Sequence, residues 1–255
     1  MVNRSYLAVA VACLGIQAAM PAAAEDADKC CFRLTPYYWA VGIDGKLEDN
    51  RGAQTSQVDF NQDIGDVTDN LEFNGSLMLE HNTGSWSNFA AVDYIKTEND
   101  DVDADVPLPS GAKLEVEADT TLATAATGYR FGAGGDSWVD LLVGVRYAKL
   151  DLEAKVKGRG QSGSAKADDD LVDGIVMLRP RVALGKNWAF SPTASVGAGD
   201  SDLVWEMAPE LVYTNNCCNL EVRFGYRSVN YEVEENNVEA DFSFQGPMIG
   251  LGFAF

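Results

Sequence analysis

Long apolar runs are missing from most of this chain, and basic residues are scarce. A helix that crosses a bilayer needs about 20 consecutive apolar residues, and nothing after residue 24 approaches that length. The exported chain therefore either is soluble or crosses a membrane as strands. Lysine and arginine number 19 against 39 aspartates and glutamates, and this acidic excess argues against nucleic acid as a partner.

Residues 1–24 have the layout of a secretory signal peptide. Arg4 lies in a short charged head, an apolar run extends from about Tyr6 to Ala19, and small residues follow up to Ala24. The apolar run is too short to span a membrane as a helix. We expect cleavage after Ala24, which leaves residues 25–255 as one exported domain.

The last stretch of the chain, Asp241 to Phe255, alternates with the period of a β-strand. One face carries Phe255, Phe253, Leu251 and Ile249, and the other carries Ala254, Gly252, Gly250 and Met248. Bulky residues on one face and small residues on the other fit a strand in the wall of a closed barrel.

The same alternation divides the chain into ten predicted strands. They are 32–46, 71–80, 86–97, 114–131, 138–152, 171–183, 188–198, 203–213, 220–233 and 241–255. Long polar loops are expected at 47–70, 98–112 and 155–170, and short turns rich in Gly or Asn alternate with them. We predict a closed antiparallel transmembrane β-barrel of ten strands, with eight and twelve strands as the alternatives.

Charged residues gather on one face of the predicted strands. They include Arg146, Arg179, Arg181, Glu206, Glu210, Arg223 and Arg227. An arginine at the middle of a bilayer costs about 2 to 4 kcal/mol, so this face is expected to point into the lumen. The turn at 215–219 would set Glu206 opposite Arg227 and Glu210 opposite Arg223, so that opposite charges meet. The second hairpin would bring Asn74 near Asp93.

Five prolines argue against this interpretation because they fall inside predicted strands. They are Pro36, Pro180, Pro192, Pro209 and Pro247. Each proline removes a backbone hydrogen bond between strands. Prolines are normally tolerated on edge strands, and a closed barrel has no edge strand. Bulges or strand ends would have to accommodate them.

Tryptophan recurs where predicted strands leave short turns, at Trp86, Trp138 and Trp188. An indole ring is apolar but its N–H needs a polar partner, so Trp is typical of membrane interfaces. We expect these three residues to form an interfacial aromatic girdle.

Signal peptide, amphipathic strands, alternating loop lengths, Trp at the turns and a terminal Phe255 together resemble the small Gram-negative outer-membrane β-barrel proteins. The resemblance covers the whole exported chain but includes no motif that specifies an activity. It implies location in the cell outer membrane, with long loops outside and short turns in the periplasm. It also implies contact with membrane lipid and lipopolysaccharide, and recognition of the strand ending at Phe255 by the barrel-assembly machinery.

Size and charge predict a lumen that is largely plugged. Around eight strands a barrel is just filled by side chains, and wide channels need 16 or more. We therefore expect a non-enzymatic protein without cofactor or metal, with a structural or surface-interaction role or narrow passage of a small solute. The sequence specifies no oligomeric state. The alternatives are an outer-membrane lipid-modifying enzyme and a secreted soluble β-sandwich binder.

Histidine and cysteine offer few routes to catalysis. His81 is the only histidine, and its parity places it with Leu77 and Leu79 on the lipid side. A protease of the ten-stranded outer-membrane type would need an Asp–His couple near the outer rim, where the sequence has no histidine. Two vicinal pairs, Cys30–Cys31 and Cys217–Cys218, are candidates for disulfides in the oxidising periplasm.

Overall fold

The computed structural model describes the chain in segments separated by gaps. The described residues are 32–49, 56–62, 71–99, 113–134, 136–158, 161–215, 219–235 and 238–255. The predicted leader and all four candidate disulfide cysteines lie outside these ranges. Within them every regular element is a β-strand. No helix in the described ranges has the length and apolar character needed to cross a membrane.

In the described ranges, fourteen strands form a single sheet. They are β1 (Phe32–Trp39), β2 (Gly42–Asp49), β3 (Ser56–Gln62), β4 (Leu71–Thr83), β5 (Trp86–Asn99), β6 (Lys113–Gly134), β7 (Ser137–Gly158), β8 (Gln161–Ala183), β9 (Trp188–Phe190), β10 (Thr193–Gly199), β11 (Leu203–Ala208), β12 (Glu210–Asn215), β13 (Leu220–Glu235) and β14 (Val238–Ala254).

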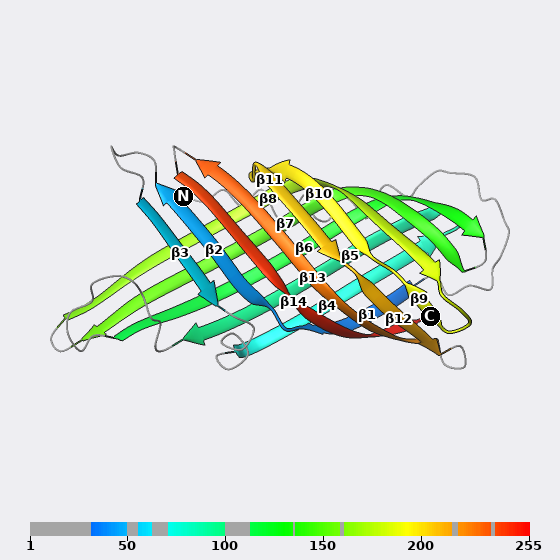
Figure 1. Ribbon diagram of the computed structural model, residues 1–255, viewed down its shortest axis with the longest axis horizontal. Coiled ribbons are helices and arrows are strands. Elements are labelled where there is room, and N and C mark those ends of the chain that lie inside the picture. Colours follow the sequence, from blue (N-terminus) through cyan, green and yellow to red (C-terminus); the bar gives the residue numbers. More distant parts are fainter. Residues whose placement is uncertain are drawn as a thin grey trace.

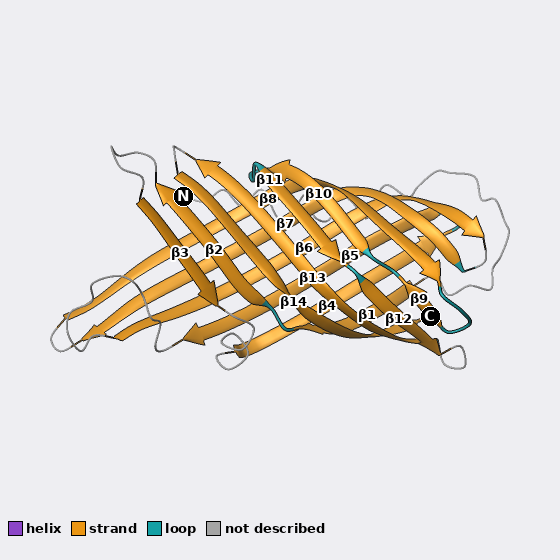
Figure 2. Cartoon of the chain, in the orientation of Figure 1, coloured by secondary structure: helices purple, strands orange, loops and turns teal. Residues whose placement is uncertain are grey.

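The sheet closes on itself as a ten-stranded antiparallel barrel (Figures 1 and 2). β1 pairs with β4 on one side and with β14 on the other, which joins the first wall strand to the last. Three wall strands are each built from two consecutive pieces, β1 with β2, β9 with β10, and β11 with β12. The predicted all-β barrel is therefore confirmed.

The two ends of the barrel differ. At the short-turn end, where Phe32 and Phe255 bond to each other through their backbones, tight turns connect the strands; Gly84 occupies one of them with φ +56°. At the opposite end, the long-loop end, β6, β7 and β8 extend well past the wall and β3 pairs with β2 (left in Figure 1).

The predicted loops at 47–70 and 155–170 were partly wrong. Residues 56–62 form β3, and the tip of the β7–β8 hairpin is paired as far as Gly158 and Gln161. Outside an apolar environment both faces of a strand can be polar, so backbone pairing continues after the hydrophobic alternation has ended. The alternation therefore marks the part of each strand that lies in the apolar belt.

The outer wall carries a continuous apolar belt. Its exposed side chains include Leu77, Leu79, Val92, Leu141, Val143, Val176, Leu178, Val196, Met207, Leu211, Phe224, Ile249, Leu251 and Phe253. The charged residues of the same strands point to the buried face. The predicted assignment of faces is thus confirmed, with apolar side chains outside and charged side chains in the lumen.

Polar side chains replace apolar ones where the belt ends toward the long loops. The Tyr147 hydroxyl donates to Asp170 Oδ1 at 2.9 Å. Lys149 forms a hydrogen-bonded ion pair with Asp151, and this hydrogen bond raises the pKa of the Lys149 ammonium above its ordinary value. Ionised groups at this level indicate that the belt stops below Lys149 on β7.

Four of the five prolines cluster at one level of the wall, and Pro36 lies apart from them, opposite Leu77 of β4. The registers of β8, β9/β10 and β11/β12 set Pro180 opposite Pro192 and Pro192 opposite Pro209. Pro247 pairs with Tyr226 on β13. The strands break at Pro192 and at Pro209. The missing N–H donors of these four prolines therefore fall in one row instead of interrupting the ladders at scattered positions, which explains how a closed barrel tolerates them.

Candidate functional site

Strand parity brings arginines and carboxylates together inside the barrel. In the described part of the lumen they occur in equal numbers. The arginines are Arg33, Arg130, Arg146, Arg179, Arg181, Arg223 and Arg227, and the acids are Glu80, Asp93, Asp140, Asp173, Glu206, Glu210 and Glu221. All seven charged residues predicted from the sequence to face the lumen are among them.

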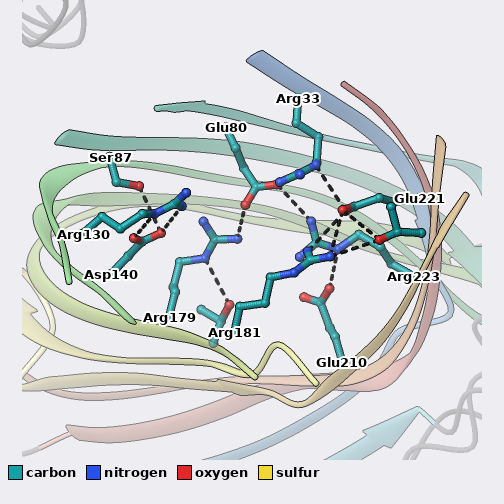
Figure 3. A network of polar contacts seen from close by, with 12 residues as sticks. Arg33, Glu80, Ser87, Arg130, Asp140, Arg179, Arg181, Glu210, Glu221 and Arg223 are labelled. Atoms are coloured by element: carbon teal, nitrogen blue, oxygen red, sulfur yellow. Dashed lines mark hydrogen bonds and ion pairs between the residues drawn. The ribbon is translucent and has the colours of Figure 1, made fainter. Parts of the chain in front are cut away.

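Glu80 of β4 lies at the centre of a first cluster near the short-turn end (Figure 3). Its Oε1 pairs with Arg179 Nη2 at 2.7 Å, and its Oε2 pairs with Arg223 Nη1 at 3.0 Å and with Arg33 Nη1 at 3.3 Å. Arg223 also holds Glu210, with Nε 2.7 Å from Oε2. Because these residues come from five different wall strands, the Glu80 cluster ties together parts of the barrel that are remote in sequence.

Glu221 extends the Glu80 cluster toward the turn between β12 and β13. Its Oε1 accepts from Arg181 Nη2 at 2.9 Å, and its Oε2 lies 3.2 Å from Arg33 Nε. Thr214 Oγ1 accepts from Arg181 Nη2 at 3.1 Å. Arg33 therefore bridges Glu80 and Glu221 across the seam where the first and last wall strands meet.

Arg227 of β13 organises a second cluster one level higher. Its Nη1 pairs with Asp93 Oδ2 and its Nε with Glu206 Oε1, both at 2.7 Å. Tyr37 donates to Asp93 Oδ1 at 2.5 Å. The guanidinium lies 4.6 Å from the centre of the Trp39 ring, a cation–π contact. The Arg227 cluster thus joins three charged groups to two aromatic ones.

Arg146 of β7 approaches Glu206 of β11 across the two wall strands, β8 and β10, that separate them. It forms an ion pair with Glu206 and donates to Thr124 Oγ1 and Ser195 Oγ, each at 3.2 Å. Glu206 is therefore shared between two arginines, Arg146 and Arg227. A carboxylate held in this way cannot move without breaking its contact with Arg146 or with Arg227.

The structure corrects the predicted role of Trp138. Asp140 is two residues further along β7 and points into the lumen, where Arg130 holds it through two bonds of 2.6 and 2.7 Å. Trp138 shares that face, and its ring contacts the Arg130 guanidinium at 4.4 Å and that of Arg181 at 5.2 Å. The simple alternation of β7 sets Trp138 on the same face as Asp140, Leu142 and Arg146, so Trp138 is not part of an outer girdle.

Trp86, Trp188 and Phe255 do lie on the outer face at the short-turn end. Phe255 is 65% exposed, and Phe32 stacks between it and His81, with ring centroids 6.0 and 4.1 Å away. The His81 ring nitrogens lie 3.1 Å from Thr83 Oγ1 and 3.4 Å from Asn88 Nδ2. His81 is therefore outside the lumen and is positioned by Phe32, Thr83 and Asn88.

An apolar layer fills the lumen above the Arg227 cluster. Along β13 the inward residues change from Arg223 and Arg227 to Val229 and Tyr231, which are 0% and 1% exposed. The layer includes Val41, Ile95, Leu122, Ala148, Leu171, Val204, Val229, Tyr231 and Phe244. The Tyr231 ring packs 5.0 Å from Phe242 and 6.4 Å from Phe244. Polar and apolar layers together leave little room inside the barrel.

The short link between β10 and β11 closes over the apolar layer. Asp173 of β8 accepts hydrogen bonds from Ser201 N and Ser201 Oγ, both at 2.9 Å. Asp200 and Asp202 accept from the backbone of Val172 and Glu234 at 2.9 and 2.6 Å. The link is thereby fixed to β8 on one side and to β13 on the other.

Sequence reasoning found the right ion pairs with a register that was two residues off. In the structure Val212 lies opposite Arg223 and Val229 opposite Glu206, so the predicted partners meet diagonally. Asn74 lies diagonal to Asp93 and donates to the Trp39 carbonyl oxygen at 2.5 Å, and Ser76 is the residue directly opposite Asp93. The roles of Arg33, Glu80 and Arg130 were missed, although the alternation of their strands would have placed them inside.

The lumen is built for fixed charge pairing. Among the residues that the structure describes, no group of three His, Cys, Asp or Glu side chains converges to hold a metal ion. Each acid of the Glu80 and Arg227 clusters contacts at least one arginine.

Comparison with known proteins identifies the fold. No protein-family profile matches the sequence, and no curated protein matches it. Among solved structures, the outer membrane protease OmpT from Escherichia coli is similar with a TM-score of 0.60 and 9% identity, over 91% of this chain and 99% of that chain. The translocator domain of the autotransporter NalP from Neisseria meningitidis matches with a TM-score of 0.44 and 11% identity, over 90% of each chain. The chain therefore has the fold of Gram-negative outer-membrane β-barrel proteins.

Proposed function

We propose that this chain is a non-enzymatic outer-membrane protein whose barrel is sealed and serves as an anchor for the long strands beyond the membrane. One observation carries the proposal: the lumen is filled by ion-paired clusters at one level and by apolar side chains at the next. Its role would be structural or would depend on contacts of the outer strands with other surfaces. The apolar belt and the predicted signal peptide support location in the outer membrane.

The sealed lumen disfavours passage of a solute. Ions would have to separate Arg227 from Asp93 and Glu206 and then cross the layer around Tyr231 and Phe244, where mostly apolar side chains would replace their water. Buried charges that are mutually paired also provide no mobile binding sites for a passing ion. We therefore expect the barrel to conduct far less than an open pore.

Conductance in a planar bilayer tests this proposal. The refolded full chain should give no steady single-channel currents, whereas a variant with Tyr231→Ala and Phe244→Ala should conduct because its apolar layer is removed. Both proteins should show the heat-dependent change in electrophoretic mobility typical of folded barrels. Steady currents from the unaltered chain, equal to those of the variant, would contradict the seal and support narrow solute passage.

Two enzymatic alternatives receive no support from the described residues. A lipid-modifying enzyme or a protease that uses histidine would depend on His81, the only histidine of the sequence. His81 lies on the outer face at the short-turn end and its ring contacts Thr83, Asn88 and Phe32. OmpT is a protease by name, but a likeness at 9% identity concerns the fold alone. Unchanged lipid A in cells that lack the protein would agree with the proposal.

The short-turn end fits the proposed assembly route. Phe255 closes the ring by exchanging backbone hydrogen bonds of 2.9 and 3.1 Å with Phe32. Its side chain is directed outward and is accessible. We propose that the barrel-assembly machinery recognises the final strand through this residue, and that the belt contacts lipid and lipopolysaccharide.

A further inference from the structure

The outer wall carries a groove just beyond the apolar belt, on the side opposite to the lumen-facing residues of the same strands. Its volume is about 510 Å³, and it is lined by residues of β2, β11, β13 and β14, among them Tyr231 and Phe242, which also pack in the apolar layer of the lumen. This size falls within the range of small-molecule sites, about 300 to 1,000 Å³. The groove opens toward the surroundings of the barrel, and most of its lining residues point outward.

Two rows of outward residues form the groove, because four neighbouring strands are in register. The first row runs from Trp205 through Asn230 and Ser243 to Asp44. In the second row Glu232 lies opposite Asp241, and Asp241 lies opposite Lys46. Trp205 is the largest side chain of the first row, and the shorter Asn230, Ser243 and Asp44 follow it across the neighbouring strands. This difference in size leaves the wall hollow beside the Trp205 ring.

Hydrogen bonds hold the base of the groove in place. Gln245 donates to Asp44 Oδ2 at 2.6 Å and accepts from the Tyr226 hydroxyl at 3.4 Å. Asn230 donates to Ser228 Oγ at 2.9 Å. Tyr226 belongs to the exposed residues of the belt, so this chain of bonds begins at the level where apolar side chains give way to polar ones. The groove is therefore preformed at the membrane interface.

We propose that this groove binds a sugar residue that is uncharged or carries an amine. Sugars present an apolar face of C–H groups and a rim of hydroxyl groups, each both donor and acceptor. Trp205, 36% exposed, provides an apolar platform with an N–H at its edge. Asp44, Glu232, Asp241 and Asn230 supply the acceptors, and Asn230 and Lys46 supply donors. Three carboxylates against one lysine disfavour phosphate-bearing sugars and favour an amino group.

The position of the groove points to the saccharide headgroups of outer-leaflet glycolipids. This part of the inference rests on the outer-membrane location proposed above, whereas recognition of the sugar itself does not. A free oligosaccharide in solution offers the same chemistry, and the experiment separates the two sources. Because no group of three carboxylates converges on a metal position within the described ranges, a divalent cation is not the expected occupant.

Fluorine NMR of the full chain with 5-fluorotryptophan tests the proposal. The protein is refolded in a detergent without a sugar headgroup, and the Trp205 resonance is assigned by its loss in Trp205→Phe. Glucosamine trimer and its N-acetylated counterpart should shift the Trp205 resonance but not that of Trp188, which is at the other end of the belt. Glucosamine 6-phosphate should bind at least tenfold more weakly than glucosamine. Trp205→Ala should abolish binding, and Trp188→Ala is the matched control.

Each outcome is decisive. No shift of the Trp205 resonance with any of these sugars overturns the proposal, and the same shift with magnesium alone reassigns the groove to cations. Binding that is tighter to lipopolysaccharide in nanodiscs than to its released oligosaccharide identifies the glycolipid as the source, and equal binding identifies free glycan. None of these measurements depends on whether the barrel conducts ions, and the NMR titration is done without a membrane. A negative result would therefore contradict sugar binding without contradicting the sealed lumen.

Discussion

The two levels of the lumen are held together by different forces. Toward the short turns, Glu80 and Arg223 join strands through ion pairs whose partners lie far apart in the sequence. Toward the long loops, Ile95, Tyr231 and Phe244 fill the same cross-section with apolar side chains. The wall is continuous through both levels, so the difference concerns only what the strands direct inward.

Directional and non-directional contacts give the two levels different tasks. An ion pair forms only when two particular residues meet, and slipping β13 by one residue would turn Arg223 and Arg227 to the apolar belt. The charged level therefore specifies register and closure. Apolar side chains accept many neighbours but exclude water, so the upper level provides the seal. Three predictions, ordered from the largest effect to the smallest, test this division.

Arg223→Leu should cause the largest loss of stability. It leaves Glu210 buried without a cation and removes one of three partners of Glu80. Breaking a buried ion pair from one side costs about 3 to 5 kcal/mol. Urea unfolding of the refolded barrel in micelles measures the change.

The matched control for this prediction is Arg223→Leu combined with Glu210→Leu. Removing both partners leaves no unpaired carboxylate, and Glu80 keeps Arg33 and Arg179. The double variant should therefore be more stable than the single one. If both variants lose the same free energy of unfolding, the charged level is not held by specific pairing.

Ile95→Ala in the apolar level should be destabilising by about 3 kcal/mol, since truncation of a buried Ile, Leu or Met usually costs about 2 to 5 kcal/mol. Ile95 is 1% exposed and lies two residues beyond Asp93 on the same face of β5. The register of the barrel should be unchanged because no ion pair is lost. Val92→Ala, on the exposed face of β5, is the control and should leave the lumen unaltered. A cost equal to that of Val92→Ala would show that the apolar level is loosely packed.

The alternation of residues predicts the part of the fold that the belt surrounds, and little beyond it. On residues 220–227 of β13 and 249–254 of β14 it assigned the faces correctly, because an inward residue there is charged or small and an outward one is apolar. On β7 and β8 it ended near residues 152 and 171, since pairing further out needs no apolar face. Trp138 was misplaced because its position after a turn was weighed above the alternation of β7, which sets it on the face of Asp140 and Arg146.

The partners inside the lumen were predictable only within a hairpin. Glu210 and Arg223 flank a single turn, so their contact follows from local pairing even with a register error of two residues. Glu80 and Arg223 meet because the ring closes and every strand is tilted, which depends on all registers at once. Sequence thus specified which residues face inward, whereas closure decides which of them touch.

His81→Ala should cause the smallest loss of stability of the three substitutions. His81 lies on the outer face and belongs to neither level of the lumen. The substitution removes a ring that stacks 4.1 Å from Phe32, and an aromatic pair contributes about 0.5 to 1.5 kcal/mol. Urea unfolding should therefore show a loss several times smaller than for Arg223→Leu, and the lumen contacts should persist. Lipid A from cells that carry only the His81→Ala protein should be the same as with the unaltered protein. A changed lipid A, with the barrel still folded by its heat-dependent mobility, would overturn the non-enzymatic proposal and make Thr83 and Asn88 the next residues to substitute.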